Sequence, residues 1–137
     1  MLYRLSLVSA LLLVLCCAGC VGGKRADNNS QAMEISFEWN GNAGSLSSPN
    51  PEIFVKNVPP GTAFMDVRMR DLNNPYDHGG GIVKYDGSGV IPAGSLSNYR
   101  GPQPPANSVH TYKFFVKALG ADKSTVLGEA SASRRYP

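Results

Sequence analysis

Residues 109–119 read VHTYKFFVKAL, and this stretch decides the fold class. From Tyr112 to Ala118 every second residue is apolar, whereas Lys113 and Lys117 fall on the opposite face. A period of two is typical of a β-strand that buries one face. No other strand-like run in the sequence is longer.

Shorter runs with the same alternation, bounded by glycine and proline, occur on both sides of this stretch. We predict further strands at residues 33–39, 53–58, 62–71, 82–85 and 125–133. After Cys20 no segment keeps a helical period for more than two turns, and the chain's 15 glycines and 10 prolines supply turns. The sequence therefore predicts one compact all-β domain, a sandwich or sheet, over residues 33–137.

The N-terminus has the parts of an export signal. Arg4 gives a positive charge, Leu5 to Leu15 is an apolar run broken by two serines, and small residues precede Cys20. This run is too short to cross a hydrocarbon core of about 30 Å as a helix. We interpret residues 1–19 as a signal peptide.

The segment Cys17-Ala18-Gly19-Cys20 resembles the lipobox of bacterial lipoproteins, usually Leu-Ala-Gly-Cys. The resemblance implies that Cys20 is lipidated, with acyl chains such as palmitate, and becomes the first residue after cleavage. The three cysteines lie at positions 16, 17 and 20, so the mature chain keeps one and forms no internal disulfide. The alternative is an ordinary secretory signal followed by an unused cysteine.

Residues 20–32 are predicted to be a lipidated tether, because VGGKRADNNSQA after Cys20 has no apolar period. As a coil, such a segment reaches roughly 20 Å. Val21 replaces the aspartate that marks inner-membrane retention in signals of this kind, which favours the periplasmic side of the outer membrane if the cell is Gram-negative. We therefore expect the membrane, through the lipid on Cys20, to be the first partner.

The charge of the chain is nearly balanced. The formal net charge is +3, and removing Arg4 with the signal leaves 12 basic and 10 acidic residues. A nucleic-acid-binding surface needs a marked basic excess. We expect no nucleic-acid partner.

Two polar residues follow apolar faces. Asp71 is in phase with Met69, and His110 is in phase with Tyr112. An unpaired buried charge is costly, so each side chain needs a partner, and one rim of the sheet can hold both. They form either a functional pair or a structural pair that pins a loop to a strand.

His78 precedes three consecutive glycines, which we interpret as a loop. Glycines permit positive φ angles and close approach of another group. Their uncovered N–H groups can also form a nest that binds an anion. The alternative is a plain loop with a surface histidine.

These residues together resemble the phosphatidylethanolamine-binding protein (PEBP) family, particularly its bacterial, kinase-inhibitor-like branch, here in a short lipoprotein form. Residues 50–62 are similar to the family's SPPLSWxxVPxGT segment, and residues 71–75 lie where the family has Asp-Pro-Asp-x-Pro. His78 falls at the family's next histidine. The most specific match is residues 99–112, where YRGPQPP and then VHTY are similar to YxGPxPPxGxHxY.

In that family the matched residues line a small pocket for phosphate, acetate or a phospholipid headgroup. The resemblance implies a ligand-binding pocket here made of Asp71, His78, Gly101, Pro104, His110 and Tyr112. Three departures stand out: Asn73 replaces the second aspartate, Gln103 replaces a cysteine common in bacterial relatives, and the family's C-terminal extension is missing. We expect a more open site, or one that a partner completes.

The expected function is non-catalytic binding of a small anion or phospholipid headgroup at the cell envelope, with no cofactor and no metal. The alternative is a protein-interaction or inhibitor module that docks an envelope protein such as a protease. Catalysis is disfavoured, because the mature chain has no thiol besides Cys20 and no serine in a nucleophile-elbow context. The two histidines and Asp71 match no known metal-binding spacing.

Overall fold

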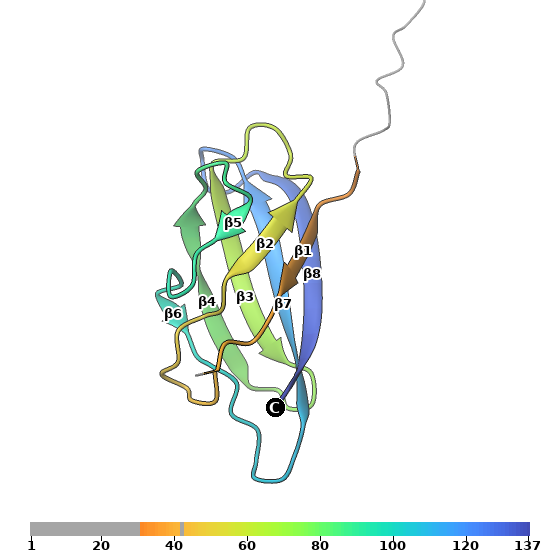
Figure 1. The fold of residues 1–137 in the computed structure, drawn as a ribbon. Coiled ribbons are helices and arrows are strands. Elements are labelled where there is room, and N and C mark those ends of the chain that lie inside the picture. Colours follow the sequence, from red (N-terminus) through yellow and green to blue (C-terminus); the bar gives the residue numbers. More distant parts are fainter. Residues whose placement is uncertain (1–30, 42) are drawn as a thin grey trace, which may run out of the picture.

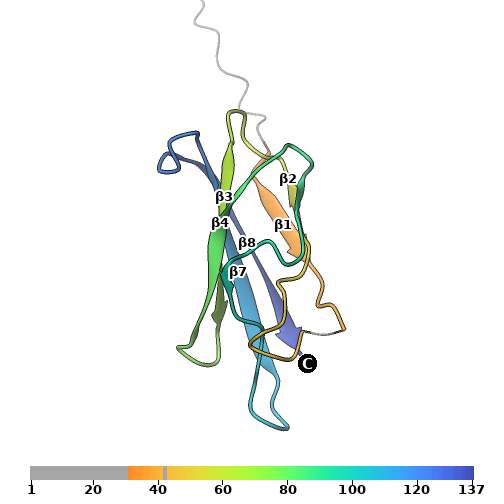
Figure 2. The same cartoon turned by 90° about the vertical axis from the view of Figure 1, so that its left-hand side faces the viewer.

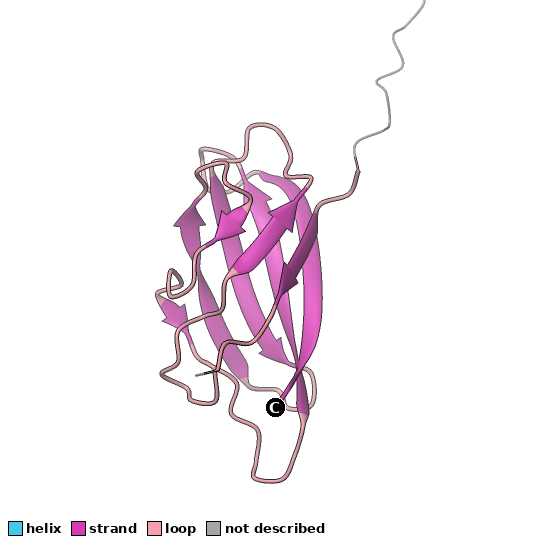
Figure 3. Ribbon diagram, in the orientation of Figure 1, coloured by secondary structure: helices cyan, strands magenta, loops and turns pink. Residues whose placement is uncertain are grey.

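The computed structural model describes residues 31–41 and 43–137. Within them the chain forms eight strands and no helix (Figure 3). The strands make two antiparallel sheets that face each other, as the edge-on view shows (Figure 2). The all-β prediction is confirmed. The predicted signal peptide, Cys20 and the tether as far as residue 30 lie outside the described residues.

The two sheets differ in size. The smaller has the order β1-β2-β5, made of β1 (Glu34–Phe37), β2 (Ile53–Lys56) and β5 (Val90–Ile91). The larger has the order β6-β4-β3-β7-β8, made of β6 (Asn98–Tyr99), β4 (Asp77–Lys84), β3 (Phe64–Asp71), β7 (His110–Leu119) and β8 (Val126–Tyr136). Five of the strands overlap predicted segments closely; β5 and β6, of two residues each, are too short to leave a periodic signal.

The core lies between the sheets. On β7 the alternate residues from Tyr112 to Ala118 are fully buried, and so are Met65, Val67 and Met69 on β3, as the period of two predicts. The smaller sheet contributes Phe37, whose ring meets the edge of the Phe114 ring at a centroid distance of 4.8 Å. Burying a side chain of this size stabilises a fold by about 1.5–3 kcal/mol. Because β3 and β7 carry most of the buried apolar side chains, these two strands contribute most of the core.

The predicted loop around His78 is wrong. We expected a strand only from residue 82, because glycine is a poor strand former. Instead β4 begins at Asp77, and its glycines pair with β3 on one side and with β6 on the other. The sheet requires glycine here, because a Cβ atom on Gly80 would lie 1.8 Å from the carbonyl oxygen of Val67. With the run inside a sheet, and the Gly79 amide donating to the Asp77 carboxylate at 2.9 Å, it forms no anion nest.

Substituting Gly80 tests this requirement. Gly80→Ala should lower the free energy of unfolding by about 3 kcal/mol, since it combines a φ of 149° with the clash against Val67. Urea denaturation measures the loss. Gly41→Ala is the matched control, because a Cβ there meets nothing within 4 Å. Equal stability of the two variants would contradict the described packing of β4.

Candidate functional site

The predicted pair of Asp71 and His110 is confirmed as a contact. Asp71 ends β3 and His110 begins β7, and the His110 Nδ1 lies 2.6 Å from the Asp71 Oδ2. The side chains are 5% and 13% exposed, respectively. The other Asp71 oxygen accepts the Asn73 amide at 2.8 Å, and the Asn73 side-chain oxygen accepts the amide of Thr111 at 2.8 Å. The pair therefore also pins the β3–β4 loop to β7.

These contacts keep the Asp71 carboxyl ionised. Its burial opposes ionisation, but hydrogen bonds from His110 and from the Asn73 amide, with the field of His110 and His78, outweigh that burial. The net result is a pKa of Asp71 below its ordinary value of 3.8. Asp71 thus carries a negative charge at neutral pH.

His78 is buried, with only 3% of its surface exposed, so the surface-histidine alternative is wrong. Its Nδ1 lies 2.9 Å from the carbonyl oxygen of Arg100 and 3.1 Å from that of Gly101. Both partners only accept hydrogen bonds, so Nδ1 must carry a proton. The other ring nitrogen, Nε2, makes no hydrogen bond with the described residues.

Tyr112 lies between the two imidazoles. Its ring centroid is 5.2 Å from that of His78 and 6.3 Å from that of His110. The hydroxyl lies near the Asp71 carboxylate and the Gln103 amide, but makes no well-formed hydrogen bond with the described residues. Burial first, and then the Asp71 charge, raise the pKa of Tyr112 to about 12. The hydroxyl therefore stays protonated and able to donate.

Gly101 and Pro104, the remaining two predicted residues, differ in whether they contact the histidine cluster. Gly101 is next to the cluster, because its carbonyl accepts the His78 proton. It must be glycine for packing, since a Cβ would lie 2.2 Å from the carbonyl oxygen of Ser45. Pro104 instead lines a neighbouring hollow of about 610 Å³ with Tyr136 and the 103–109 loop. Contacts thus join five of the six predicted residues, and Pro104 lies beside them.

Three further residues belong to this region and were missed by the prediction. The Tyr76 ring packs edge-on against His78 at 4.8 Å, and its hydroxyl accepts a hydrogen bond from Arg100 Nη1 at 2.8 Å. The Tyr99 hydroxyl is buried and has no partner among the described residues, and burial raises its pKa well above the ordinary value. Arg100 could have been noticed, because it is the charged residue next to Gly101 in YRGPQPP.

No family model and no curated protein sequence matches this chain. Solved structures do. The crystal structure of a putative PEBP homolog, CT736 from Chlamydia trachomatis, has a TM-score of 0.54 and 14% identity, over 77% of this chain and 97% of that one. The structure of E. coli YbcL, titled a new member of the mammalian PEBP family, has a TM-score of 0.56 and 15% identity, over 77% and 98%.

The fold is PEBP-like. At these identities the likeness is one of fold, and a fold does not by itself define a ligand. The chemistry of the PEBP-like domain must therefore be argued from its own side chains.

In this PEBP-like domain both histidines use Nδ1 for a hydrogen bond to a fixed acceptor. Neither Nε2 atom has a hydrogen-bond partner within the described residues. When protonated, both Nε2 atoms are donors, and both imidazole rings lie near the ring of Tyr112. Several convergent donors suit an oxyanion. Among residues 31–41 and 43–137, no three His, Cys, Asp or Glu side chains group closely enough to hold a metal ion.

Replacing Asp71 should reduce the sensitivity of the domain to acid. The pKa of Asp71 is lower in the folded state than its ordinary value of 3.8, so its ionised form adds stability above that value. That stability is lost as the pH falls through the folded pKa. The free energy of unfolding should therefore fall more steeply below about pH 4 in the wild type than in Asp71→Asn.

Urea denaturation at a series of pH values measures the two slopes. Asp66→Asn, on the same strand but away from the histidines, is the control, because it removes a carboxylate paired with Arg68 and leaves the contact of Asp71 with His110 in place. Parallel curves for the wild type and Asp71→Asn would contradict the coupling of Asp71 to His110.

Proposed function

We propose that this chain is a lipid-anchored, non-catalytic binding module whose PEBP-like domain holds a small oxyanion at His78, His110 and Tyr112. The PEBP-like fold supports a binding role. One observation carries the proposal: two imidazole rings lie within 5.2 and 6.3 Å of the Tyr112 ring, whose buried hydroxyl has no hydrogen-bond partner in the described chain. A phosphate group, free or on a phospholipid headgroup, matches these donors in chemistry.

The charges at the site affect whether an anion binds. Asp71 is ionised at neutral pH and repels an anion unless a neighbouring imidazole is protonated. A protonated His110 cancels that charge, and the exposed Arg100 and Arg70 add positive charge at the rim. Anion binding is therefore favoured when His110 is protonated and the two arginines are left at the rim.

Phosphate titration tests the proposal directly. Inorganic phosphate should shift the ring signals of His78 and His110 in NMR spectra. His110→Ala should abolish the shift of the His78 signals. Lys117→Ala, near the other end of β7 and paired with Glu129, is the matched control and should keep it. Unchanged spectra up to tens of millimolar phosphate would disprove anion binding.

The lipid anchor rests on the lipobox-like sequence before Cys20. No helix within residues 31–41 and 43–137 is long and apolar enough to span a membrane. We place the chain in the cell envelope, on the periplasmic side of the outer membrane if the cell is Gram-negative. This placement follows from the signal sequence and Val21.

Cys20→Ser should move the protein from the membrane fraction to the soluble fraction without unfolding the domain, because it removes only the acylated thiol. Fractionation and immunoblotting measure the distribution, and circular dichroism checks the fold. A serine variant that still sediments with membranes would refute the lipid anchor.

A second candidate is a docking module for an envelope protein, for example a protease. Four large apolar side chains near the site are 37–54% exposed: Leu46, Leu72, Tyr76 and Val109. Leu72→Ser should then weaken crosslinking to one envelope protein while leaving the phosphate shifts intact. Esterase or phosphatase activity that disappears in Asp71→Ala would instead contradict the non-catalytic proposal.

A further inference from the structure

We infer that the oxyanion site faces away from the membrane that anchors the chain, so that its ligand is a soluble phosphate-type anion and not a headgroup of the anchoring leaflet. The inference rests on the proposed function, that is, on a lipid at Cys20 and an anion at His78 and His110. It follows from where the described chain begins and where the two histidines lie.

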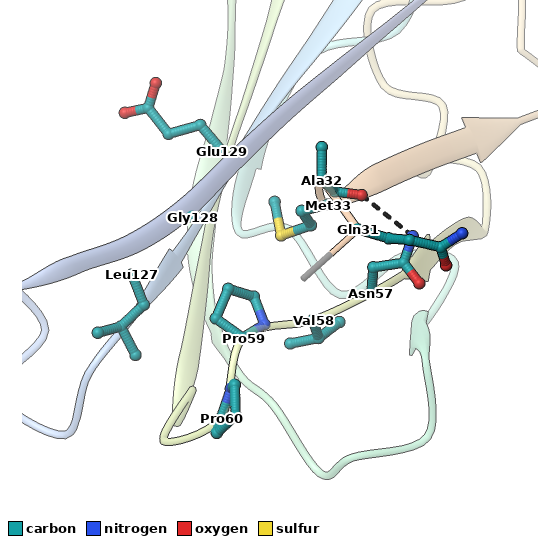
Figure 4. Close-up of a pocket in the computed structure, with 10 residues that line it drawn as sticks. All are labelled: Gln31, Ala32, Met33, Asn57, Val58, Pro59, Pro60, Leu127, Gly128 and Glu129. Atoms are coloured by element: carbon teal, nitrogen blue, oxygen red, sulfur yellow. Dashed lines mark hydrogen bonds between the residues drawn. The ribbon is translucent and has the colours of Figure 1, made fainter. Parts of the chain in front are cut away.

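The described chain begins at what we call the tether end of the sandwich, which holds residues 31–33, 57–60 and 127–129. These residues surround one hollow of about 890 Å³ (Figure 4). The side chain of Asn57 donates to the carbonyl oxygen of Ala32 at 3.1 Å. Pro59 packs so closely on Gly128 that a Cβ there would lie 2.7 Å from it. The point where the chain enters the domain is therefore held in place.

The histidine site lies at the opposite end, which we call the site end. β7 runs from His110, which pairs with Tyr136, to Leu119, which pairs with Val126 at the tether end. In Figures 1 and 2 the chain enters at one end of the sandwich, and the C-terminus lies towards the other. The length of β7 therefore separates the entry of the tether from the anion site.

β1 also runs from the tether end towards the site end, because it lies beside β8 along its length. The Trp39 Nε1 donates to the carbonyl oxygen of Arg135 at 2.8 Å, and the Arg134 Nε donates to that of Phe37 at 3.0 Å. These bonds join the end of β1 to the end of β8 near Tyr136. The chain thus enters at the tether end and runs down β1 towards the site end.

The length of β7 and the reach of the tether decide which end of the domain faces the membrane. Ten strand residues span about 30 Å at roughly 3.3 Å each. The reach predicted for the tether as a coil is only roughly 20 Å. To place His110 against the anchoring headgroups, the domain would have to turn over and the tether would have to extend well beyond its coil length, at a cost in entropy. The tether end therefore faces the anchoring leaflet, and the site end faces the aqueous space.

Energy transfer from two labelled positions tests the orientation. Ala106→Cys places a thiol in the exposed 100–109 loop at the site end, and Ala121→Cys places one in the exposed β7–β8 turn at the tether end. The full chain is expressed in bacteria, purified from membranes, labelled with a donor dye and reconstituted into phosphatidylcholine vesicles that contain an acceptor-labelled lipid. With Cys20 acylated, the new thiol is the one that reacts.

We expect several-fold higher transfer from position 121 than from position 106. Equal transfer, or stronger transfer from position 106, would overturn the orientation. Transfer from neither position would show that the chain is not anchored and would overturn the inference as well. The two variants share the same residue type, exposure and label, so a difference between them reports position.

Trp39 reports the source of the ligand. It is the single tryptophan of the chain, and its ring lies 5.8 Å from that of Tyr112. Phosphate should change its fluorescence with the same midpoint in detergent-solubilised protein, which has no headgroups, and in phosphatidylcholine vesicles, whose headgroups carry phosphate. A several-fold weaker phosphate response in the vesicles than in detergent would show that anchoring headgroups reach the site, which would overturn the inference.

A failure of the proposed function can be told apart from a failure of the orientation. If phosphate changes nothing in detergent-solubilised protein, in which every headgroup has been removed, anion binding itself is wrong. In that case the soluble-anion half of the inference falls with it. The transfer experiment still decides the orientation, because it does not depend on a ligand.

Discussion

The antiparallel pairing of β3 with β7 is the constraint on which the rest of the structure depends. Its register places Asp71 opposite Tyr112, and it brings His110 within 2.6 Å of the Asp71 carboxylate. The same register buries alternate residues of both strands against Phe37 from the smaller sheet. A shift by one residue would turn the whole apolar set to solvent and separate the acid from the imidazole. Core and site are therefore specified by one set of backbone hydrogen bonds.

Two glycines allow the close backbone packing that positions the site. Gly80 lets β3 pass close to β4, and Gly101 lets residues 43–45 pack against the loop that carries the acceptors for His78. With these backbones in place, the His78 proton is held on Nδ1 between two carbonyl oxygens. Nε2 of each histidine then has a defined direction, and this preorganisation supports the proposal of an anion site.

The polarity of the sandwich links the fold to its proposed anchor. β1 begins at the tether end and the histidines lie at the site end, so the proposed anchor gives the domain one end near the membrane and one end far from it. In this arrangement the exposed apolar side chains around the site, such as Leu72 and Val109, are presented to the aqueous space. A soluble anion and a partner protein would both approach from that side, which is why the two proposed functions share one surface.

A period of two along each strand states which side chains share a face, so the sequence by itself determined the all-β class, most of the strands and the expectation that Asp71 and His110 meet at one rim of the sheet. The PEBP-like fold was indicated by the resemblance of its motifs, above all residues 99–112. The sequence could not determine that the glycine run is a strand, since strand propensity does not register a close approach by Val67 and Asn98. Tyr76 and Arg100 were missed, because their contacts join separate loops. That the site lies at the end opposite Gln31 was decided only by the tertiary structure, because the direction in which each strand crosses the sandwich depends on long-range pairing.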